Sequence, residues 1–303
     1  IFGKFIMSRG ILNLKINFSL ASRIKRTIKR ILSLPYKIER IQEALGRIES
    51  RQCSGLEVES SEFRVFSQWG EDGIIQHLLS KITIQKKIFV EFGVEDYKES
   101  NTRFLVINNY WDGLIIDGSK KNISSVKEDK IYWASNIKAI SSFITKDNIN
   151  KLIKSNNIIG EIGLLSIDID GNDFWVWEQI DVIDPAIVIV EYNSQFGPYA
   201  NVSIPYSKNF VRGLNNKHIS FYGASLTALT NLGRRKGYSL VASNNAGNNA
   251  FFVRDDLISD FQVLSPVQAY RKACFREAKN SIDGQIEYQS IKERFENMKN
   301  YKV

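Results

Sequence analysis

Four oxygen-bearing side chains lie within six residues near the middle of the chain, in its densest group of carboxylates. Asp168, Asp170, Asn172 and Asp173 follow the apolar run GLLSI. Carboxylate and amide oxygens are ligands that Mg²⁺ and Mn²⁺ prefer, and a bound cation lowers the pKa of a hydroxyl group. The cluster therefore predicts a divalent metal site, while turn and capping chemistry is the structural alternative for the same residues. Asp168 and Asp170 are also candidate general bases.

Acidic residues end two earlier apolar runs as well. The run KIFVEF contains Glu91 and leads into Gly93, which lets the chain turn tightly beside a ligand. The run GLIID ends in Asp117, where a carboxylate can accept both ribose hydroxyls of an adenosine, with N-capping of the next helix as the alternative. A single glycine among carboxylates disfavours a dinucleotide, whose pyrophosphate requires G-x-G-x-x-G. A cationic sulfonium ligand suits this loop better.

A loop for a second substrate is predicted after the run AIVIVE. Glu191, Tyr192 and Asn193 open a segment rich in Gly, Pro, Ser, Tyr and Asn, whose side chains can stack on and hydrogen-bond to a sugar ring. Tyr222 is a further candidate for substrate binding. His218, which precedes it, is a candidate general base because an imidazole titrates near pH ~6.5, and a structural role is its alternative.

These residues meet at one edge only if parallel strands carry them, and the pattern of the chain predicts such strands. Short apolar runs alternate with helical stretches from residue 63 onward, as βαβ units require. Strands are expected at Lys87–Phe92, Gly113–Asp117, Ile131–Ala134, Gly163–Asp168, Ala186–Glu191, Tyr238–Ser243 and Asn248–Arg254. Helices are expected at Ser100–Asn109, Lys120–Lys127, Asp147–Ser155, Asn172–Ile180 and Gly223–Lys236, with Asp147 and Asn172 as N-caps.

This order predicts a Rossmann-like α/β fold of the class I methyltransferase type. Its sheet has seven strands, mostly parallel, and the last strand is antiparallel. We expect a basic helical extension at residues 1–60, the methyltransferase domain at 61–260 and a helical segment at 261–303. No apolar run reaches the roughly 18 residues of a membrane span, and no signal-peptide pattern is present, so the expected location is the cytoplasm.

The positive charge of the chain belongs to the N-terminal extension. Residues 1–50 hold eleven Lys or Arg and three Glu, which accounts for the whole net charge of +8. A neutral body argues against nucleic acid as a partner, because binding there depends on neutralising several phosphates. Isoleucines recur at helical spacing on both sides of Pro35 and predict two amphipathic helices. These helices either pack on the body of the protein or on a second copy of the chain, or bind peripherally at the inner face of a membrane.

Eight short motifs resemble the FkbM-type methyltransferases, and more closely a subgroup found in bacterial polysaccharide clusters. The motifs are FSQWGED (66–72), VEFG (90–93), ESNT (99–102), IIDG (115–118), SIDIDGND (166–173), IVEYN (189–193), YGASL (222–226) and NAFFV (249–253). The resemblance implies S-adenosylmethionine as the methyl donor and an O-methylation, usually on a glycan or secondary metabolite.

The resemblance also implies a set of cofactor residues. Gln68, Glu71 and Asp72 would cover the cofactor pocket, and Glu91, Gly93 and Asp117 would contact the cofactor; we place Asp168 with them. One departure is that the E-x-G-x-G pattern of methyltransferases here reads EFGVE, with a carboxylate at the second glycine.

Together these observations predict an S-adenosylmethionine-dependent O-methyltransferase. Its acceptor is expected to be a sugar hydroxyl in bacterial surface polysaccharide biosynthesis, on a glycan or a nucleotide- or lipid-linked sugar, with Mg²⁺ or Mn²⁺ as a second cofactor. One alternative is methylation of a phosphorylated or phosphoramidate glycan substituent. A non-catalytic scaffold of a glycan assembly complex is the other.

Overall fold

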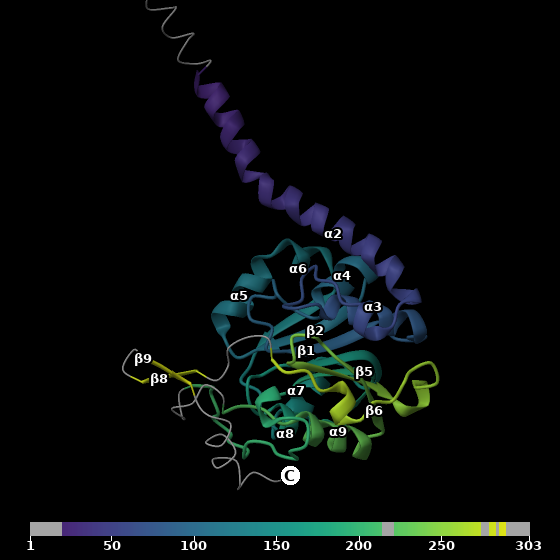
Figure 1. Ribbon diagram of the computed structural model, residues 1–303. Coiled ribbons are helices and arrows are strands. Elements are labelled where there is room, and N and C mark those ends of the chain that lie inside the picture. The colour runs from purple at the N-terminus through teal and green to yellow at the C-terminus, as the bar shows by residue number, and fades with distance from the viewer. Residues whose placement is uncertain (1–19, 214–220, 274–278, 283–284, 289–303) are drawn as a thin grey trace, which may run out of the picture. The chain divides into compact units, whose positions relative to one another are not determined.

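Seven strands form one sheet in the order β3-β2-β1-β4-β5-β7-β6 (Figure 1). Neighbouring strands are parallel except at β7, which is antiparallel to both β5 and β6. The strands are β1 (Ile88–Phe92), β2 (Asp112–Asp117), β3 (Ile137–Ser141), β4 (Gly160–Ile167), β5 (Ile183–Glu191), β6 (Tyr238–Ser243) and β7 (Asn249–Arg254). This is the class I methyltransferase fold, and it confirms the predicted fold class.

The computed structural model describes residues 20–213, 221–273, 279–282 and 285–288. Within it the chain divides into two compact units, Ile1–Leu45 and Gly46–Val303. The sheet lies in the second unit. The fold places the carboxyl ends of β1, β2, β4 and β5 beside one another, because these four strands are adjacent and parallel.

Helices cover both faces of the sheet and enclose two apolar cores. In Figure 1, α3, α4, α5 and α6 lie on one face, and α7, α8 and α9 lie on the other. The helices are α3 (Glu71–Lys81), α4 (Arg103–Asn109), α5 (Lys120–Glu128), α6 (Lys130–Ala134), α7 (Ile149–Ser155), α8 (Asp173–Gln179), α9 (Leu226–Arg235) and α10 (Pro266–Ala269). Short 3₁₀ turns lie at Cys53–Gly55, Val58–Ser60, Ser194–Phe196 and Asp255–Leu257. Side chains of the central strands are buried on both faces, as continuous apolar runs predict.

The prediction of a strand at Ile131–Ala134 is wrong. These residues belong to helix α6, because Asp129 accepts a hydrogen bond from the backbone N–H of Ile131 (2.9 Å) and caps the helix start. The third strand is Ile137–Ser141, in which buried Ile137 and Ala139 flank exposed Lys138. This alternation is the pattern of a half-buried strand.

One of the two predicted N-caps also needs correction. Helix α7 begins at Ile149 with Asn148 at its N-cap position, and Asp147 instead lies 3.8 Å from the ammonium group of Lys208. Asn172 does occupy the N-cap position of α8, but its side chain makes no capping hydrogen bond.

The two termini of the described chain differ in structure. Residues 20–32 are helical, and α2 (Leu34–Gln52) follows after a turn at Ser33, so the predicted amphipathic helices are present. At the other end, β8 (Lys279–Ile282) and β9 (Gln285–Tyr288) form an antiparallel pair, where we expected helix. Within the part of the chain that the structure describes, no helix is long and apolar enough to cross a membrane.

Candidate active site

A cavity of about 810 Å³ lies at the carboxyl ends of the parallel strands. This volume is within the range of roughly 300–1,000 Å³ that is usual for small-molecule sites. Its described lining carries seven carboxylates and one guanidinium, from Glu91, Glu95, Glu99, Asp117, Asp168, Asp170, Glu191 and Arg212. An excess of carboxylates favours a cationic ligand over a phosphate.

Glu91, at the end of β1, holds a neighbouring loop in place. Its carboxylate accepts hydrogen bonds from the Ser100 hydroxyl (2.5 Å), the Asn101 backbone N–H (2.9 Å) and the Thr102 hydroxyl. Burial raises the pKa of Glu91, although these donors oppose the rise. The side chain of Asn101 then donates to the Ser166 hydroxyl on β4 (3.1 Å). Glu91 therefore fixes Asn101, which lines the cavity beside it.

Gly93 allows the chain after β1 to approach the end of β4. Its φ angle is +70°, and its backbone N–H donates to the Ile116 carbonyl (3.0 Å). A Cβ atom at this position would lie 1.5 Å from the carbonyl oxygen of Asp168. Only glycine meets both conditions, because other residues rarely adopt a positive φ and all of them carry a Cβ.

Asp117, at the end of β2, is held by the loops on either side of it. One carboxylate oxygen accepts from the Ser119 backbone N–H (2.7 Å), and the other accepts from the Glu95 backbone N–H (2.9 Å). The N-cap of α5 is Ser119, whose hydroxyl accepts from the Asn122 backbone N–H (3.2 Å), so the capping alternative for Asp117 is wrong. Asp117 is fixed at the wall of the cavity.

Phe143 is a cavity residue that the sequence analysis missed. Ser142, Phe143 and Ile144 follow β3 and line the cavity next to Asp117, and the Phe143 side chain is 45% exposed. A half-exposed aromatic ring beside a fixed carboxylate can stack on a planar ligand. The sequence did not indicate this residue, because the third strand was expected at Ile131–Ala134, whereas Phe143 follows the strand at Ile137–Ser141.

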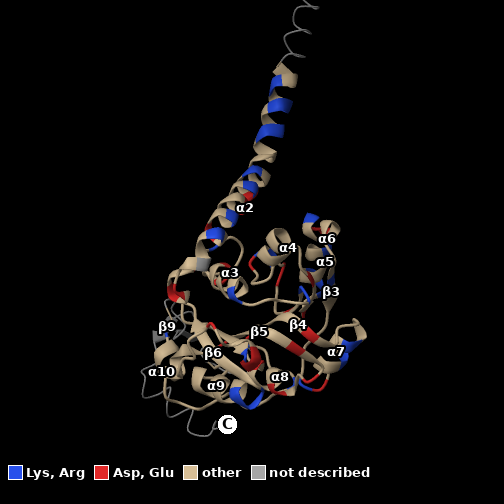
Figure 2. Cartoon of the chain, turned by 90° about the vertical axis from the view of Figure 1, so that its right-hand side faces the viewer, with Lys and Arg blue, Asp and Glu red and all other residues tan. Residues whose placement is uncertain are grey.

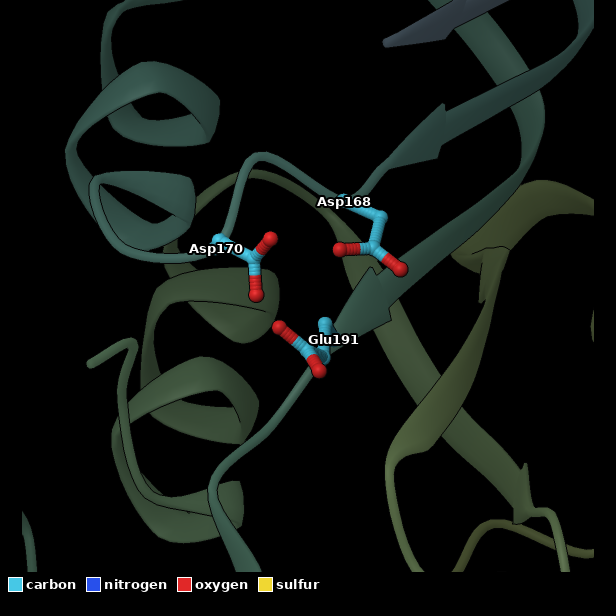
Figure 3. Close-up of side chains that lie close together, drawn as sticks. All are labelled: Asp168, Asp170 and Glu191. Carbon is cyan, nitrogen blue, oxygen red and sulfur yellow. The ribbon is translucent and has the colours of Figure 1, made fainter. Parts of the chain in front are cut away.

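Three carboxylates come together at the end of β4 and β5. Asp168, Asp170 and Glu191 each offer an oxygen atom, and these atoms lie within 4.8 Å of one another (Figure 3). Unit charges at this separation repel by at least about 3 kcal/mol at an effective dielectric constant of about 20. The three groups therefore favour a shared proton or a bound cation.

The pKa values follow from this crowding. Burial, and then the neighbouring charges of Asp170 and Asp173, raise the pKa of Asp168 well above its usual value. Burial raises the pKa of Glu191 in the same way, with Asp168 as its strongest charged neighbour. A carboxyl group with a raised pKa is a better general base, since its basicity lies nearer to neutral pH.

Asn172 and Asp173 contribute to the loop rather than to this cluster. The Asp173 carboxylate accepts from the backbone N–H groups of Ile169 and Gly171 (2.8 Å each), and burial raises its pKa to about 6. The Asn172 amide donates to the Ser207 carbonyl (2.8 Å), although the residue also lines the cavity. The third carboxylate of the cluster is instead Glu191, which the sequence analysis had assigned to substrate binding.

Arg212 is the second residue that sequence reasoning missed. Its guanidinium donates to Asp170 (2.5 Å) and lies 3.7 Å from the centroid of the Tyr222 ring. A single arginine in a polar loop gives no sequence signal, because only the fold brings it to the acidic cluster 42 residues away.

Gln68, Glu71 and Asp72 lie in the segment before and at the start of α3, and only Gln68 lines the cavity. The Glu71 carboxylate accepts from the side-chain amides of Asn244 (2.7 Å) and Asn249 (2.8 Å). The Asp72 carboxylate accepts from three backbone N–H groups, those of Val65, Phe66 and Ser67. The two acids therefore shape the loop that presents Gln68.

Three of the predicted substrate residues are buried, namely Tyr192, Asn193 and Tyr222. Tyr192 donates its hydroxyl to the Arg271 carbonyl (3.0 Å), and the Asn193 amide donates to the Tyr222 carbonyl (3.1 Å). None of the three is among the described lining residues. His218 lies outside the described residues.

No protein-family model and no curated protein match the chain. Among solved structures, it is similar to the N-terminal domain of EvdMO1 with S-adenosylhomocysteine bound, at 10% identity and a TM-score of 0.41, over 72% of this chain and 94% of that chain. It is also similar to an S-adenosylmethionine-dependent methyltransferase from Clostridium acetobutylicum, at 9% identity and a TM-score of 0.36, over 55% and 83%.

A third similar structure is TrmK from M. capricolum in complex with S-adenosylhomocysteine. It has 13% identity and a TM-score of 0.33, over 59% of this chain and 65% of that chain. At these values the likeness gives no information on activity or substrate. Membership of the FkbM family stays a prediction.

Proposed function

We propose that this protein transfers a methyl group from S-adenosylmethionine to a sugar hydroxyl. The observation that carries the proposal is the acidic cavity at the carboxyl ends of β1, β2, β4 and β5 in a class I methyltransferase fold. Ligands of open α/β sheets bind at this edge. The motif resemblance to FkbM-type enzymes supports the same assignment.

The cavity residues fit the chemistry of this cofactor. Asp117 is held so that a carboxylate faces the cavity, where it can accept hydrogen bonds from the two ribose hydroxyls. Phe143 offers a ring for the adenine, and the surplus of carboxylates suits the sulfonium and ammonium charges. The cofactor supplies a methyl group on a positively charged sulfur, which keeps the bonding electron pair when the methyl leaves.

The carboxylate cluster is the part of the cavity that can act on the acceptor. A sugar hydroxyl is a weak nucleophile and must lose its proton as the new C–O bond forms. Asp168 and Glu191, whose pKa values are raised by burial, can accept that proton. Asp168 is the member of the cluster whose backbone lies directly beside Gly93, so we assign it the role of general base.

An uncharged hydroxyl is favoured as the acceptor over a phosphorylated group. Among the described lining residues, Arg212 carries the single cationic side chain, and it is already paired with Asp170. A phosphate would face several carboxylates here, and their charges would repel it. This reasoning favours a neutral sugar over the phosphorylated or phosphoramidate alternative.

Phe143→Ala is expected to weaken S-adenosylmethionine binding about tenfold or more. Loss of a stacked ring removes about 1–3 kcal/mol per base in other proteins, and about 1.4 kcal/mol corresponds to tenfold. Calorimetric titration of the cofactor into the wild type and the variant measures the effect. Phe143→Trp serves as the matched control, because it keeps an aromatic ring and should retain most of the affinity.

The activity itself is tested with labelled S-adenosylmethionine and a panel of neutral, phosphorylated and nucleotide-linked sugars. Transfer of label to a neutral sugar, reduced at least about a hundredfold in Asp168→Asn, is the expected result. Absence of cofactor binding in the wild type would exclude the methyltransferase and leave the scaffold role. Transfer only to phosphorylated sugars would contradict the choice of acceptor.

A further inference from the structure

Glu191 has a buried oxygen atom without a hydrogen-bond donor. The residue is 6% exposed, and its Oε2 atom has no hydrogen-bond partner in the described part of the chain. Its carboxylate is directed toward Asp170 and the space beside Asp168 (Figure 3). Buried polar atoms are almost always satisfied, so an orphaned carboxylate oxygen beside a cavity points to a ligand that completes it.

The ligand that best completes this atom is a divalent cation. Asp168, Asp170 and Glu191 converge with their oxygens within 4.8 Å of one another, a separation that lets three carboxylates share one ion. Three carboxylates and the guanidinium of Arg212 carry a net charge of −2 when ionised, which a divalent ion neutralises. Hard oxygen donors select Mg²⁺ or Mn²⁺ over softer metals.

We propose that Asp168, Asp170 and Glu191 bind Mg²⁺ or Mn²⁺, and that the ion holds two neighbouring oxygens of the acceptor. Mg²⁺ retains open positions when protein supplies only a few carboxylates, so substrate oxygens can complete its shell. A pair of adjacent sugar hydroxyls is a chelating ligand of this kind. Each carboxylate that binds through one oxygen keeps the other free, and Asp168 can still take the hydroxyl proton.

The ion site itself does not depend on the proposed methyl transfer, whereas its role in holding the acceptor rests on it. The site also differs from the one that the sequence predicts. Glu191 comes from β5 and takes the place of Asn172 and Asp173, whose polar side chains already bond to the loop.

Titration of Mn²⁺ alone into the full chain, followed by electron paramagnetic resonance, tests the site. We expect one bound ion per chain, and Glu191→Gln should weaken its binding at least about tenfold, as is usual for altered metal shells. Glu99→Gln is the matched control, because Glu99 lines the same cavity but lies outside the cluster. Its affinity for Mn²⁺ should equal that of the wild type.

A second variant gives a result that misfolding cannot imitate. Arg212→Gln removes the cation that competes for Asp170, so Mn²⁺ should bind several-fold more tightly. No Mn²⁺ binding at millimolar concentration, or equal binding in the wild type and Glu191→Gln, would overturn the proposal. Cofactor titration of the same samples separates the two ideas: Mn²⁺ binding without cofactor binding would reject the methyltransferase and keep the ion site.

The helical segment of residues 20–45, called the N-terminal helix below, carries an independent feature, an apolar stripe exposed along its length. Each of its large aliphatic residues is at least 50% exposed, namely Leu20, Ile24, Ile28, Ile31, Leu32, Leu34, Ile38, Ile41 and Leu45. Residues 20–33 also hold five Lys or Arg and no acidic residue (Figure 2). An exposed aliphatic stripe beside a basic surface is the pattern of a helix that lies on an anionic lipid surface.

We infer that this helix binds an anionic membrane surface. Pairing of two copies would bring two segments of the same sign together, and their repulsion disfavours self-association. The apolar stripe would enter the lipid boundary while the basic side chains contact the headgroups. The charge complementarity therefore favours lipid over a second copy of the chain.

Co-sedimentation of the full chain with vesicles tests this inference. We expect binding to phosphatidylglycerol vesicles, at least about tenfold weaker binding to phosphatidylcholine vesicles, and loss at high salt. Ile28→Gln/Ile31→Gln should weaken binding without altering thermal unfolding, because both side chains are exposed. Equal binding to both lipids, or a stable dimer that binds neither, would reject it.

Discussion

Replacing Asp117 by alanine is expected to weaken S-adenosylmethionine binding at least about a hundredfold. Hydrogen bonds to a charged group contribute about 1.5–3 kcal/mol each, and the carboxylate would lose two of them with the ribose hydroxyls. A total of about 3 kcal/mol corresponds to roughly a hundredfold in affinity. Calorimetric titration of the cofactor measures this directly.

Ser119→Ala is the control for this effect. Ser119 lies in the same turn and caps α5, so its loss should lower the free energy of unfolding by about 1 kcal/mol. It removes no carboxylate from the cavity, and cofactor affinity should change little. Equal affinity in Asp117→Ala and the wild type would show that the cofactor does not bind at the end of β2.

Gly93→Ala is expected to lower the free energy of unfolding by about 3 kcal/mol or more. A left-handed conformation costs a non-glycine residue about 1–2 kcal/mol. The added Cβ would also lie 1.5 Å from the Asp168 carbonyl oxygen, and overpacking of this kind costs about 1–3 kcal/mol. Chemical denaturation measures the change in stability.

Gly118→Ala distinguishes this steric effect from a general intolerance of the cavity wall. Gly118 lines the same cavity, and the nearest atom to its added Cβ would be Phe143 Cδ2 at 3.8 Å, an ordinary contact. Its stability should stay within about 1 kcal/mol of the wild type. If the Gly93→Ala protein were as stable as Gly118→Ala, the chain after β1 would not approach the Asp168 carbonyl as closely as described.

Local patterns in the sequence were enough to predict the architecture. Buried parallel strands read as continuous apolar runs, such as IFVEF and GLIID, and the intervening stretches have the period of helices. Where the run was short, as in IYWA, period and length could not separate strand from helix. The Asp129 side chain caps this segment as helix α6. Because the third strand was therefore placed too early in the chain, Phe143 was not predicted as a cavity residue.

The acidic site was predicted only in part, for a related reason. The sequence by itself determined the alternation of strands and helices in the sheet apart from the third strand, the conformation of the turn at Gly93 and the presence of carboxylates at four strand ends. Only the tertiary structure decided which carboxylates meet. Asp168 and Asp173 are neighbours along the chain, yet Asp173 bonds to backbone N–H groups, and Glu191 joins Asp168 because β4 and β5 pair in parallel. Arg212, which is distant from Asp170 in the sequence, pairs with it only in the folded chain. Contacts between distant residues depend on strand pairing and loop closure, which no local pattern encodes.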